Sequence, residues 1–212
     1  MEQVKMQLFL LIVLVLGIKA PVVQGCTCLP AHLQDHFCHS QIVIRAKIIG
    51  QKTATQSMRL YGAKTIEYKI KLIKTFKGFD KVDNIQYVYT PFDDSLCGVR
   101  LDAENKVQYL LSGYLWNEKV MIELCGVNEL WENLSLSQKK NLKYRYQKGC
   151  ECQIRDCYTS TCRATSANEC VWYPFSRESL QGVCMKRTNG SCNWYTEKSD
   201  NVRQNGMGET SM

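Results

Sequence analysis

Cysteine content constrains this chain of 212 residues more than any other feature, because all twelve cysteines lie after position 25. An even number of cysteines in an exported chain predicts a framework of disulfides. Five of them fall between positions 26 and 149, and seven are crowded between positions 150 and 192. Twelve cysteines allow about ten thousand complete pairings, so their number leaves the connectivity open.

Export is indicated by residues 1–25, which have the pattern of a signal peptide. Lys5 supplies positive charge, an apolar run follows from Leu8 to Gly17, and the small residue Gly25 precedes the expected cleavage site. The apolar run is shorter than the roughly 20 residues of a membrane-spanning helix. We therefore expect a soluble protein with no membrane span, secreted to the extracellular space or matrix. A retained signal anchor is the alternative.

The distribution of cysteines predicts two domains after the leader. Residues 26–150 are apolar enough to build a core, whereas residues 151–195 are short and polar and depend on disulfides. Residues 196–212 are polar and are expected to form a disordered tail. The formal net charge of +7 predicts attraction to anionic polymers of the matrix or the cell surface.

Hydrophobic periodicity predicts a mainly β first domain with small helices. A short helix is expected from Pro30 to Ser40, with Leu33 and Phe37 on one face and with His32 and His36 facing solvent. Alternating or β-branched segments predict five strands, at residues 42–49, 66–72, 85–89, 107–114 and 119–124. This set favours a closed antiparallel barrel of the oligonucleotide-binding type, with a flat sandwich as the alternative.

A second helix is expected from a cap at Ser135 or Ser137 to about Lys148, with Leu142 and Tyr146 facing inward. Its basic residues have no acidic partner within the run. They form either an ordinary solvated face, with cations near the favourable C-terminal end of the helix, or a patch that binds sulfated polysaccharides. The residues concerned are Lys139, Lys140, Lys143, Arg145 and Lys148.

Two glycosylation sequons begin at Asn133 and Asn189. The turn-like sequence around Asn189 makes it the better acceptor, because Asn133 lies beside an expected helix start. Neither sequon bears on catalysis, and the chain has none of the serine-hydrolase, zinc-protease or phosphate-binding motifs. We therefore expect no enzyme. Metal binding by the two Cys-x-Cys pairs is an alternative, but an oxidising compartment favours disulfides.

The expected mature N-terminus, Cys26-Thr27-Cys28, predicts a different chemistry. Cleavage before Cys26 leaves a free α-amine, whose pKa is about 7.7–8.0. Its neutral form and the adjacent carbonyl oxygen can chelate a zinc ion. On the catalytic zinc of a protease, this chelate displaces the water that acts as nucleophile. Thr27 would then enter the specificity pocket, and disulfides at both cysteines would hold the tip in place.

The chain closely resembles the tissue inhibitors of metalloproteinases over residues 26–195. The segments that carry the resemblance are Cys26-Thr27-Cys28, Val43–Lys47, Tyr89-Thr90-Pro91, Cys97-Gly98-Val99 and Gly149-Cys150-Glu151-Cys152. Departures include Leu33 and Leu130, where prolines are usual, and the short spacing between Cys170 and Cys184. The tail also lacks the acidic stretch that some members of the family carry. These departures put a contact with a protease zymogen through the C-terminal domain in doubt.

This resemblance implies a netrin-like barrel followed by a small disulfide-rich domain. It implies a wedge, made of Cys26, Thr27, Cys28, Leu29 and Pro30 together with Ser95, Leu96 and Cys97, that enters the cleft of zinc metalloproteinases. It also implies the disulfides Cys26–Cys97, Cys28–Cys125, Cys38–Cys150, Cys152–Cys192, Cys157–Cys162 and Cys170–Cys184. The expected protein is a monomer with no cofactor of its own, which coordinates the zinc of its target.

Two other functions remain open at this point. The same barrel occurs in extracellular matrix-binding or signalling modules that inhibit nothing, and the positive charge fits such a role. The position of the mature N-terminus separates these two functions, since chelation requires Cys26 to be first. Barrels of this type also bind oligonucleotides, but secretion argues against a nucleic-acid partner.

Overall fold

A computed structural model describes residues 25–54, 64–82, 84–159, 161–174, 176 and 181–196. The leader, up to residue 24, and the tail, from residue 197, lie outside the described residues, as does the tip of the first hairpin. No helix among the described residues has the length and apolar character needed to cross a bilayer. The expectations for the signal peptide and for the tail therefore stay predictions.

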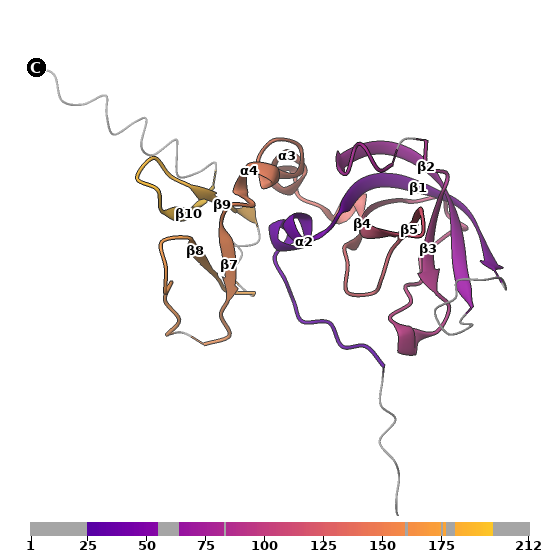
Figure 1. Ribbon diagram of the computed structural model, residues 1–212, viewed down its shortest axis with the longest axis horizontal. Helices are drawn as coiled ribbons and strands as arrows, with labels where there is room; N and C mark the ends of the chain where they lie inside the picture. The colour runs from indigo at the N-terminus through magenta and orange to yellow at the C-terminus, as the bar shows by residue number, and fades with distance from the viewer. Residues whose placement is uncertain are drawn as a thin grey trace, which may run out of the picture.

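The first part of the chain is a sheet closed into a ring. Its strands are β1 (Ile42–Ala54), β2 (Thr65–Lys77), β3 (Tyr87–Pro91), β4 (Gln108–Trp116), β5 (Lys119–Met121) and β6 (Asn128–Leu130). They follow the order β1-β2-β3-β5-β4-β6, and an additional pairing of β1 with β4 closes the ring. The expected five-stranded barrel is confirmed (Figure 1), although β3 and β5 pair in parallel rather than antiparallel, and β6 pairs with β4 beside β5.

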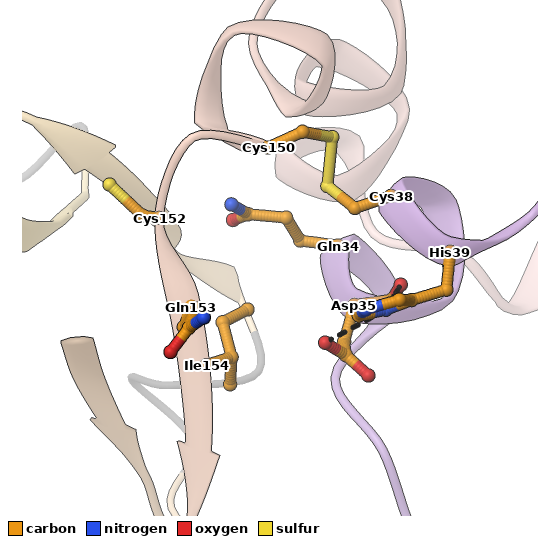
Figure 2. A pocket seen from close by; sticks show the side chains of 8 residues that line it. All are labelled: Gln34, Asp35, Cys38, His39, Cys150, Cys152, Gln153 and Ile154. Atoms are coloured by element: carbon orange, nitrogen blue, oxygen red, sulfur yellow. Dashed lines mark hydrogen bonds and ion pairs between the residues drawn. A yellow bond between two sulfur atoms is a disulfide. The ribbon is translucent and has the colours of Figure 1, made fainter. Parts of the chain in front are cut away.

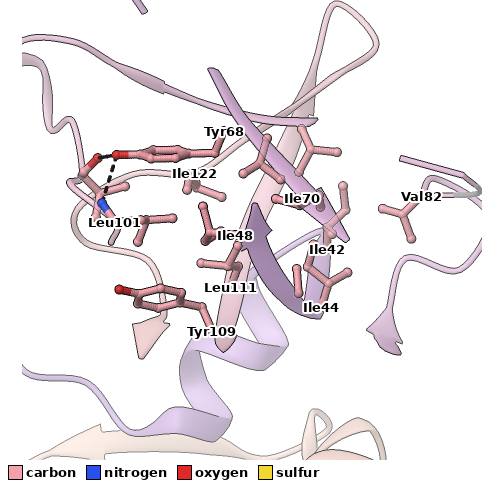
Figure 3. Packing of buried hydrophobic residues seen from close by; sticks show 14 of the residues in the cluster. Ile42, Ile44, Ile48, Tyr68, Ile70, Val82, Leu101, Tyr109, Leu111 and Ile122 are labelled. Carbon is pink, nitrogen blue, oxygen red and sulfur yellow. Dashed lines mark hydrogen bonds between the residues drawn. The ribbon is translucent and has the colours of Figure 1, made fainter. Parts of the chain in front are cut away.

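Alternation along β1 and β2 produces the interior of the barrel. Ile42, Ile44 and Ile48 on β1 meet Tyr68 and Ile70 on β2 inside the barrel (Figure 3). Ala46 and Ile66 belong to the same buried cluster. Alternation in residues 66–72 predicts one buried face, and the structure buries Ile66, Tyr68 and Ile70 on that face of β2. Strands β1 and β2 extend further than predicted, to Ala54 and Lys77, because each pairs with the other along almost its full length.

Strands β3 and β5 differ from their predicted bounds. Strand β3 begins at Tyr87 rather than at position 85, and β5 ends at Met121 rather than at position 124. After β5 the chain turns, and the backbone N–H of Leu124 donates to the carbonyl of Cys97 at 2.8 Å. The connection from β4 to β5 is a tight turn in which Asn117 and Glu118 have positive φ.

Three helices cover one side of the barrel, and a second core lies beneath them. They are α2 (Leu33–His39), α3 (Leu136–Tyr144) and α4 (Tyr146–Gly149). Ser135 caps α3 in a reciprocal capping box with Gln138, so one of the two predicted caps is confirmed. Leu142 and Tyr146 are buried as predicted. The second predicted helix is divided at Arg145, whose φ and ψ of −125° and −40° interrupt it.

His32 corrects the prediction of two solvent-facing histidines on the first helix. The helix begins at Leu33, and His32 is its N-cap, with Nδ1 accepting a hydrogen bond from the N–H of Gln34 at 3.1 Å. The side chain of His32 is 1% exposed. It packs edge-on against Trp194, Trp172 and Tyr146 at centroid distances of 5.0, 5.7 and 6.3 Å. His32 is buried because the C-terminal part of the chain covers it.

The C-terminal part consists of two small sheets. Strand β7 (Gln153–Asp156) pairs in parallel with β8 (Glu169–Trp172), and β9 (Val183–Lys186) pairs with β10 (Cys192–Tyr195). The sequence analysis expects this part to be polar and to depend on disulfides, but it also makes apolar contact with the rest of the chain. Val183 is completely buried in the second core, beside Phe37 and Tyr146. The region from β7 to β10 therefore helps to bury the helices that cover the barrel (Figure 1).

Candidate functional site: a disulfide-tied wedge

Each of the twelve cysteines is in a disulfide. The pairs are the six that the family resemblance implies: Cys26–Cys97, Cys28–Cys125, Cys38–Cys150, Cys152–Cys192, Cys157–Cys162 and Cys170–Cys184. The sulfur atoms of Cys152, Cys184 and Cys192 lie within 4.8 Å of one another. Because all three are oxidised, they offer no thiolate to a metal ion. The alternative of a cysteine-bound metal is therefore not supported.

The N-terminal segment Cys26–Pro30 is extended and largely exposed, and it leads directly into α2 (Figure 1). Two disulfides attach it to the barrel. Cys26 is joined to Cys97 with a Cα–Cα distance of 5.4 Å, and Cys28 is joined to Cys125 at 5.2 Å. Two attachments only two residues apart restrict both the position and the direction of the tip.

The second segment of the wedge is the 3₁₀ turn η1 (Asp94–Leu96), which ends at Cys97. Cys97 has a φ of 60°, and its N–H donates to the carbonyl of Asp94 at 3.1 Å. This left-handed residue reverses the chain and presents Ser95 and Leu96 outward, both of them exposed. The Cys26–Cys97 disulfide thus brings together the two segments that were predicted to form one wedge.

Three exposed leucines lie on or beside this wedge. Leu29, Leu96 and Leu124 are 74%, 47% and 41% exposed. Leu124 was missed by the sequence analysis, which placed it in a strand. Its neighbour Cys125 was the available signal, because the bond to Cys28 brings residue 124 to the tip. Tyr114 fixes the same turn by donating from its hydroxyl to Glu123 at 2.5 Å, and burial together with this bond raises the pKa of Tyr114 to about 12.

The wedge projects from the surface, and one cavity lies apart from it, between α2 and β7. That cavity has a volume of about 410 Å³ and is lined by Gln34, Asp35, Cys38, His39, Cys150, Cys152, Gln153 and Ile154 (Figure 2). His39 lies 3.3 Å from Asp35 on the same face of α2. Burial lowers the pKa of nearby His36 and raises the pKa of Asp156. The cysteines that line the cavity are oxidised, so they supply no nucleophile.

The two sequons differ in local structure. Asn189 is exposed, and its Oδ1 accepts hydrogen bonds from the N–H and the hydroxyl of Ser191 at 3.0 and 2.8 Å. Asn133 is exposed as well, but its amide donates to Glu129 at 2.7 Å. The hydroxyl of Ser135 is engaged as the cap of α3. The preference for Asn189 as the glycosylation site stays a prediction.

Comparison with known proteins identifies the family. A family model described as tissue inhibitor of metalloproteinase matches residues 24–194. The chain is 48% identical over 181 residues to metalloproteinase inhibitor 4 of Mus musculus, covering 81% of each chain. It is 43% identical over 190 residues to metalloproteinase inhibitor 3 of Xenopus laevis, covering 86% of each. These relatives are named as inhibitors rather than enzymes, in agreement with the lack of catalytic motifs, and the chain belongs to the tissue inhibitor of metalloproteinase family.

Proposed function

We propose that this protein inhibits zinc metalloproteinases through the wedge, as a secreted monomer. The observation that carries the proposal is the Cys26–Cys97 disulfide, which sets the exposed N-terminal segment beside exposed Ser95 and Leu96. The names of the relatives support the target class. Six disulfides support an extracellular location, since such bonds persist in oxidising compartments. Glycosylation at Asn189 belongs to the same proposal.

The proposed mechanism begins with removal of residues 1–25, which makes Cys26 the first residue. Its α-amine is partly neutral at physiological pH, because the usual pKa of such a group is about 7.7–8.0. The amine nitrogen and the carbonyl oxygen of Cys26 then bind the zinc of the target protease and occupy the position of its water. The zinc belongs to the target. No scissile bond reaches the metal, because no peptide bond precedes Cys26.

Preorganisation makes this mechanism effective. A short free peptide loses conformational entropy when it binds, and rigid attachment before binding reduces that loss. Here the attachment is made by Cys26–Cys97 and Cys28–Cys125, and by α2, which begins at Leu33. The exposed side chains of Thr27, Leu29 and Leu96 remain available to the protease.

The direct test is N-terminal sequencing of the secreted protein, followed by titration against a panel of active zinc metalloproteinases. We expect Cys26 as the first residue and stoichiometric inhibition of several members of the panel. A protein that begins at Cys26, is correctly folded and inhibits none of them would favour the matrix-binding or signalling alternative.

Replacement of Thr27 by Gly should weaken inhibition unevenly across proteases. Thr27 is the first exposed side chain after Cys26, and the pockets that receive it differ in depth between targets. Loss of a packed side chain of this size costs about 1–3 kcal/mol of binding free energy. Inhibition constants of the variant should be compared with those of Thr188→Gly, which removes an exposed threonine far from the wedge along the chain. Equal losses for every protease would contradict a role in specificity.

A second proposed property is binding of sulfated polysaccharides by the basic face of α3. Lys139 and Arg45 both lie over the ring of Trp131, at 5.4 and 4.2 Å from its centroid. The pKa of Tyr144 is lowered by a hydrogen bond from Lys143 and by the charges of nearby lysines on α3 and β2. Arg145 instead lies over Tyr195, at 4.8 Å. The proposed patch is therefore centred on Lys139, Lys140 and Lys143.

Replacement of Lys139, Lys140 and Lys143 by Gln should lower the salt concentration at which the protein elutes from heparin. Contacts between exposed charges weaken as salt rises, because screening acts over about 8 Å in physiological salt. The matched control replaces Lys81, Lys119 and Lys186 by Gln. It removes the same amount of positive charge from positions outside α3. If both triple variants elute at the same salt concentration, the effect reflects net charge alone and the patch is refuted.

A further inference from the structure

Two hydroxyl groups inside the barrel hold the chain that follows the wedge. Tyr68 on β2 and Thr90 on β3 are both completely buried. The hydroxyl of Tyr68 accepts a hydrogen bond from the N–H of Leu101 at 2.9 Å and donates to the carbonyl of Val99 at 3.3 Å (Figure 3). The hydroxyl of Thr90 accepts from the N–H of Val99 at 3.0 Å. Burial raises the pKa of Tyr68, so its hydroxyl keeps the proton that it donates at neutral pH.

These contacts lie close to the wedge along the chain. Val99 is two residues after Cys97, and the residue between them, Gly98, is buried and closely packed. A Cβ on Gly98 would lie 2.2 Å from the carbonyl oxygen of Pro91 at the end of β3. The anchored segment Val99–Leu101 is therefore joined to the wedge by one close-packed residue, and any shift of this segment moves Cys97. Through the Cys26–Cys97 disulfide, such a shift also reaches Cys26.

The η1 part of the wedge has little apolar contact with the core of the barrel. None of the residues of η1 is buried, so no apolar contact in the core fixes the position of Ser95 and Leu96. Arg100 stabilises the start of the same loop from outside, by donating to the carbonyl of Phe92 and lying over its ring at 4.8 Å. This contact is exposed, and exposed contacts contribute little. The buried hydroxyls thus fix the chain on this side of the wedge from the core, in addition to the bond from the N–H of Leu124 to the carbonyl of Cys97 at the wedge itself.

We propose that Tyr68 and Thr90 are positioning residues for inhibition, which set the placement of the Cys97 segment, and hence of Cys26, from the interior of the barrel. They do not touch the protease. This inference rests on the proposed function, because it concerns how the same wedge is held. A buried donor or acceptor that loses its partner is costly, so the segment will move or gain water when either hydroxyl is removed. A tip that is ordered less well before binding then binds less tightly.

Four variants test the proposal. Tyr68→Phe and Thr90→Val remove each hydroxyl with little change in shape, and Thr90→Ser keeps the hydroxyl of Thr90. The matched control is Tyr109→Phe. Tyr109 is also buried, and its hydroxyl accepts from the N–H of Asp102 at 3.1 Å, one residue beyond the anchored segment. Both tyrosine variants lose one hydroxyl from the same core, so their difference isolates the effect on the wedge.

We expect Tyr68→Phe and Thr90→Val to weaken inhibition of every protease tested by about tenfold, mainly through faster dissociation. Thr90→Ser and Tyr109→Phe should stay near the wild type. Inhibition is measured at a temperature well below the thermal unfolding midpoint of each variant, so that all of the protein is folded. Equal losses in Tyr68→Phe and Tyr109→Phe would overturn the proposal, since the cause would then be a weaker core. Wild-type inhibition by both Tyr68→Phe and Thr90→Val would overturn it as well.

Hydrogen exchange in the free protein provides a readout that needs no protease. The N–H groups of Cys97 and Leu124 are bonded at the base of the wedge. They should exchange faster in Tyr68→Phe and Thr90→Val than in Tyr109→Phe and Thr90→Ser. Unchanged exchange would overturn the inference even if inhibition fell. If the wild type inhibits no metalloproteinase, the proposed function fails, while this exchange measurement still decides whether the hydroxyls hold the wedge.

Discussion

Addition of one residue before Cys26 should reduce inhibition of every target protease together, by about a hundredfold or more. The added residue converts the α-amine into an amide, whose nitrogen does not bind zinc. It also places atoms where the metal would lie, and a misplacement of about 1 Å is enough to cost a factor of this size. Space beside the tip is small, because a Cβ at position 25 would lie 2.3 Å from the Cα of Ser95. Inhibition constants against several proteases measure the effect.

Two controls separate chelation from misfolding. An extra residue placed after Met212 should leave inhibition unchanged, and circular dichroism should show the same fold for both extended proteins. Acetylation of the α-amine adds few atoms and removes the same lone pair, so it should reproduce the loss. Potent inhibition by a folded protein that carries the extra residue would show that the amine is not the zinc ligand.

Removal of the chain after residue 150, which leaves Cys152 and its partner out, should preserve inhibition but reduce the free energy of unfolding by roughly 3 kcal/mol or more. All predicted wedge residues lie within residues 26–150, which supports an autonomous inhibitory domain. The loss of stability follows from the second core, where Val183 is completely buried against the helices. Burial of one such side chain contributes about 1.5–3 kcal/mol, and further contacts are lost with it. Denaturant unfolding and inhibition assays of the truncated chain measure the two effects.

Gln34 shows where these further contacts lie. Its side chain is completely buried on α2. The amide nitrogen donates to the carbonyls of Gly149 and Cys184 at 3.0 and 2.8 Å, and the amide oxygen accepts from the N–H of Cys184 at 2.8 Å. Gln34 therefore joins the helix that follows the wedge to β9, and two of its three bonds disappear in the truncated chain.

The stability prediction can be tested further by introducing Gln34→Leu into the full chain and into the chain that ends at residue 150. In the full chain the substitution leaves the N–H and the carbonyl of Cys184 without their bonds to Gln34, which costs about 1–3 kcal/mol for each group. The carbonyl of Gly149 keeps its bond from the N–H of Cys152 at 3.0 Å. In the truncated chain Cys184 is absent, so the same substitution should cost much less. Equal costs in the two chains would contradict the coupling between α2 and β9. A truncated chain as stable as the full one would refute the shared core.

Local pattern was sufficient for much of the barrel. Alternation from Ile66 to Ile70 identified the inward face of β2, because side chains of a strand point to opposite faces in turn. A cap at Ser135 or Ser137 followed from chemistry within one turn of helix, and the structure has it at Ser135. Strand β6 was missed, since Asn128–Leu130 is three residues long and has no periodicity to read. Its existence depends on the edge of β4, to which it pairs.

The amino-acid sequence by itself determined the family, the places of five of the barrel strands and the presence of a cysteine at the expected mature N-terminus. Only the tertiary structure decided which polar side chains are buried and which groups they bond to. His32 and Gln34 are adjacent to the wedge in sequence, yet they are buried by Trp172, Trp194 and Cys184, more than a hundred residues away. The hydroxyl of Tyr68 likewise finds its partners at Val99 and Leu101. Periodicity records which face of an element is apolar, but a hydrogen bond depends on two groups that folding alone brings together.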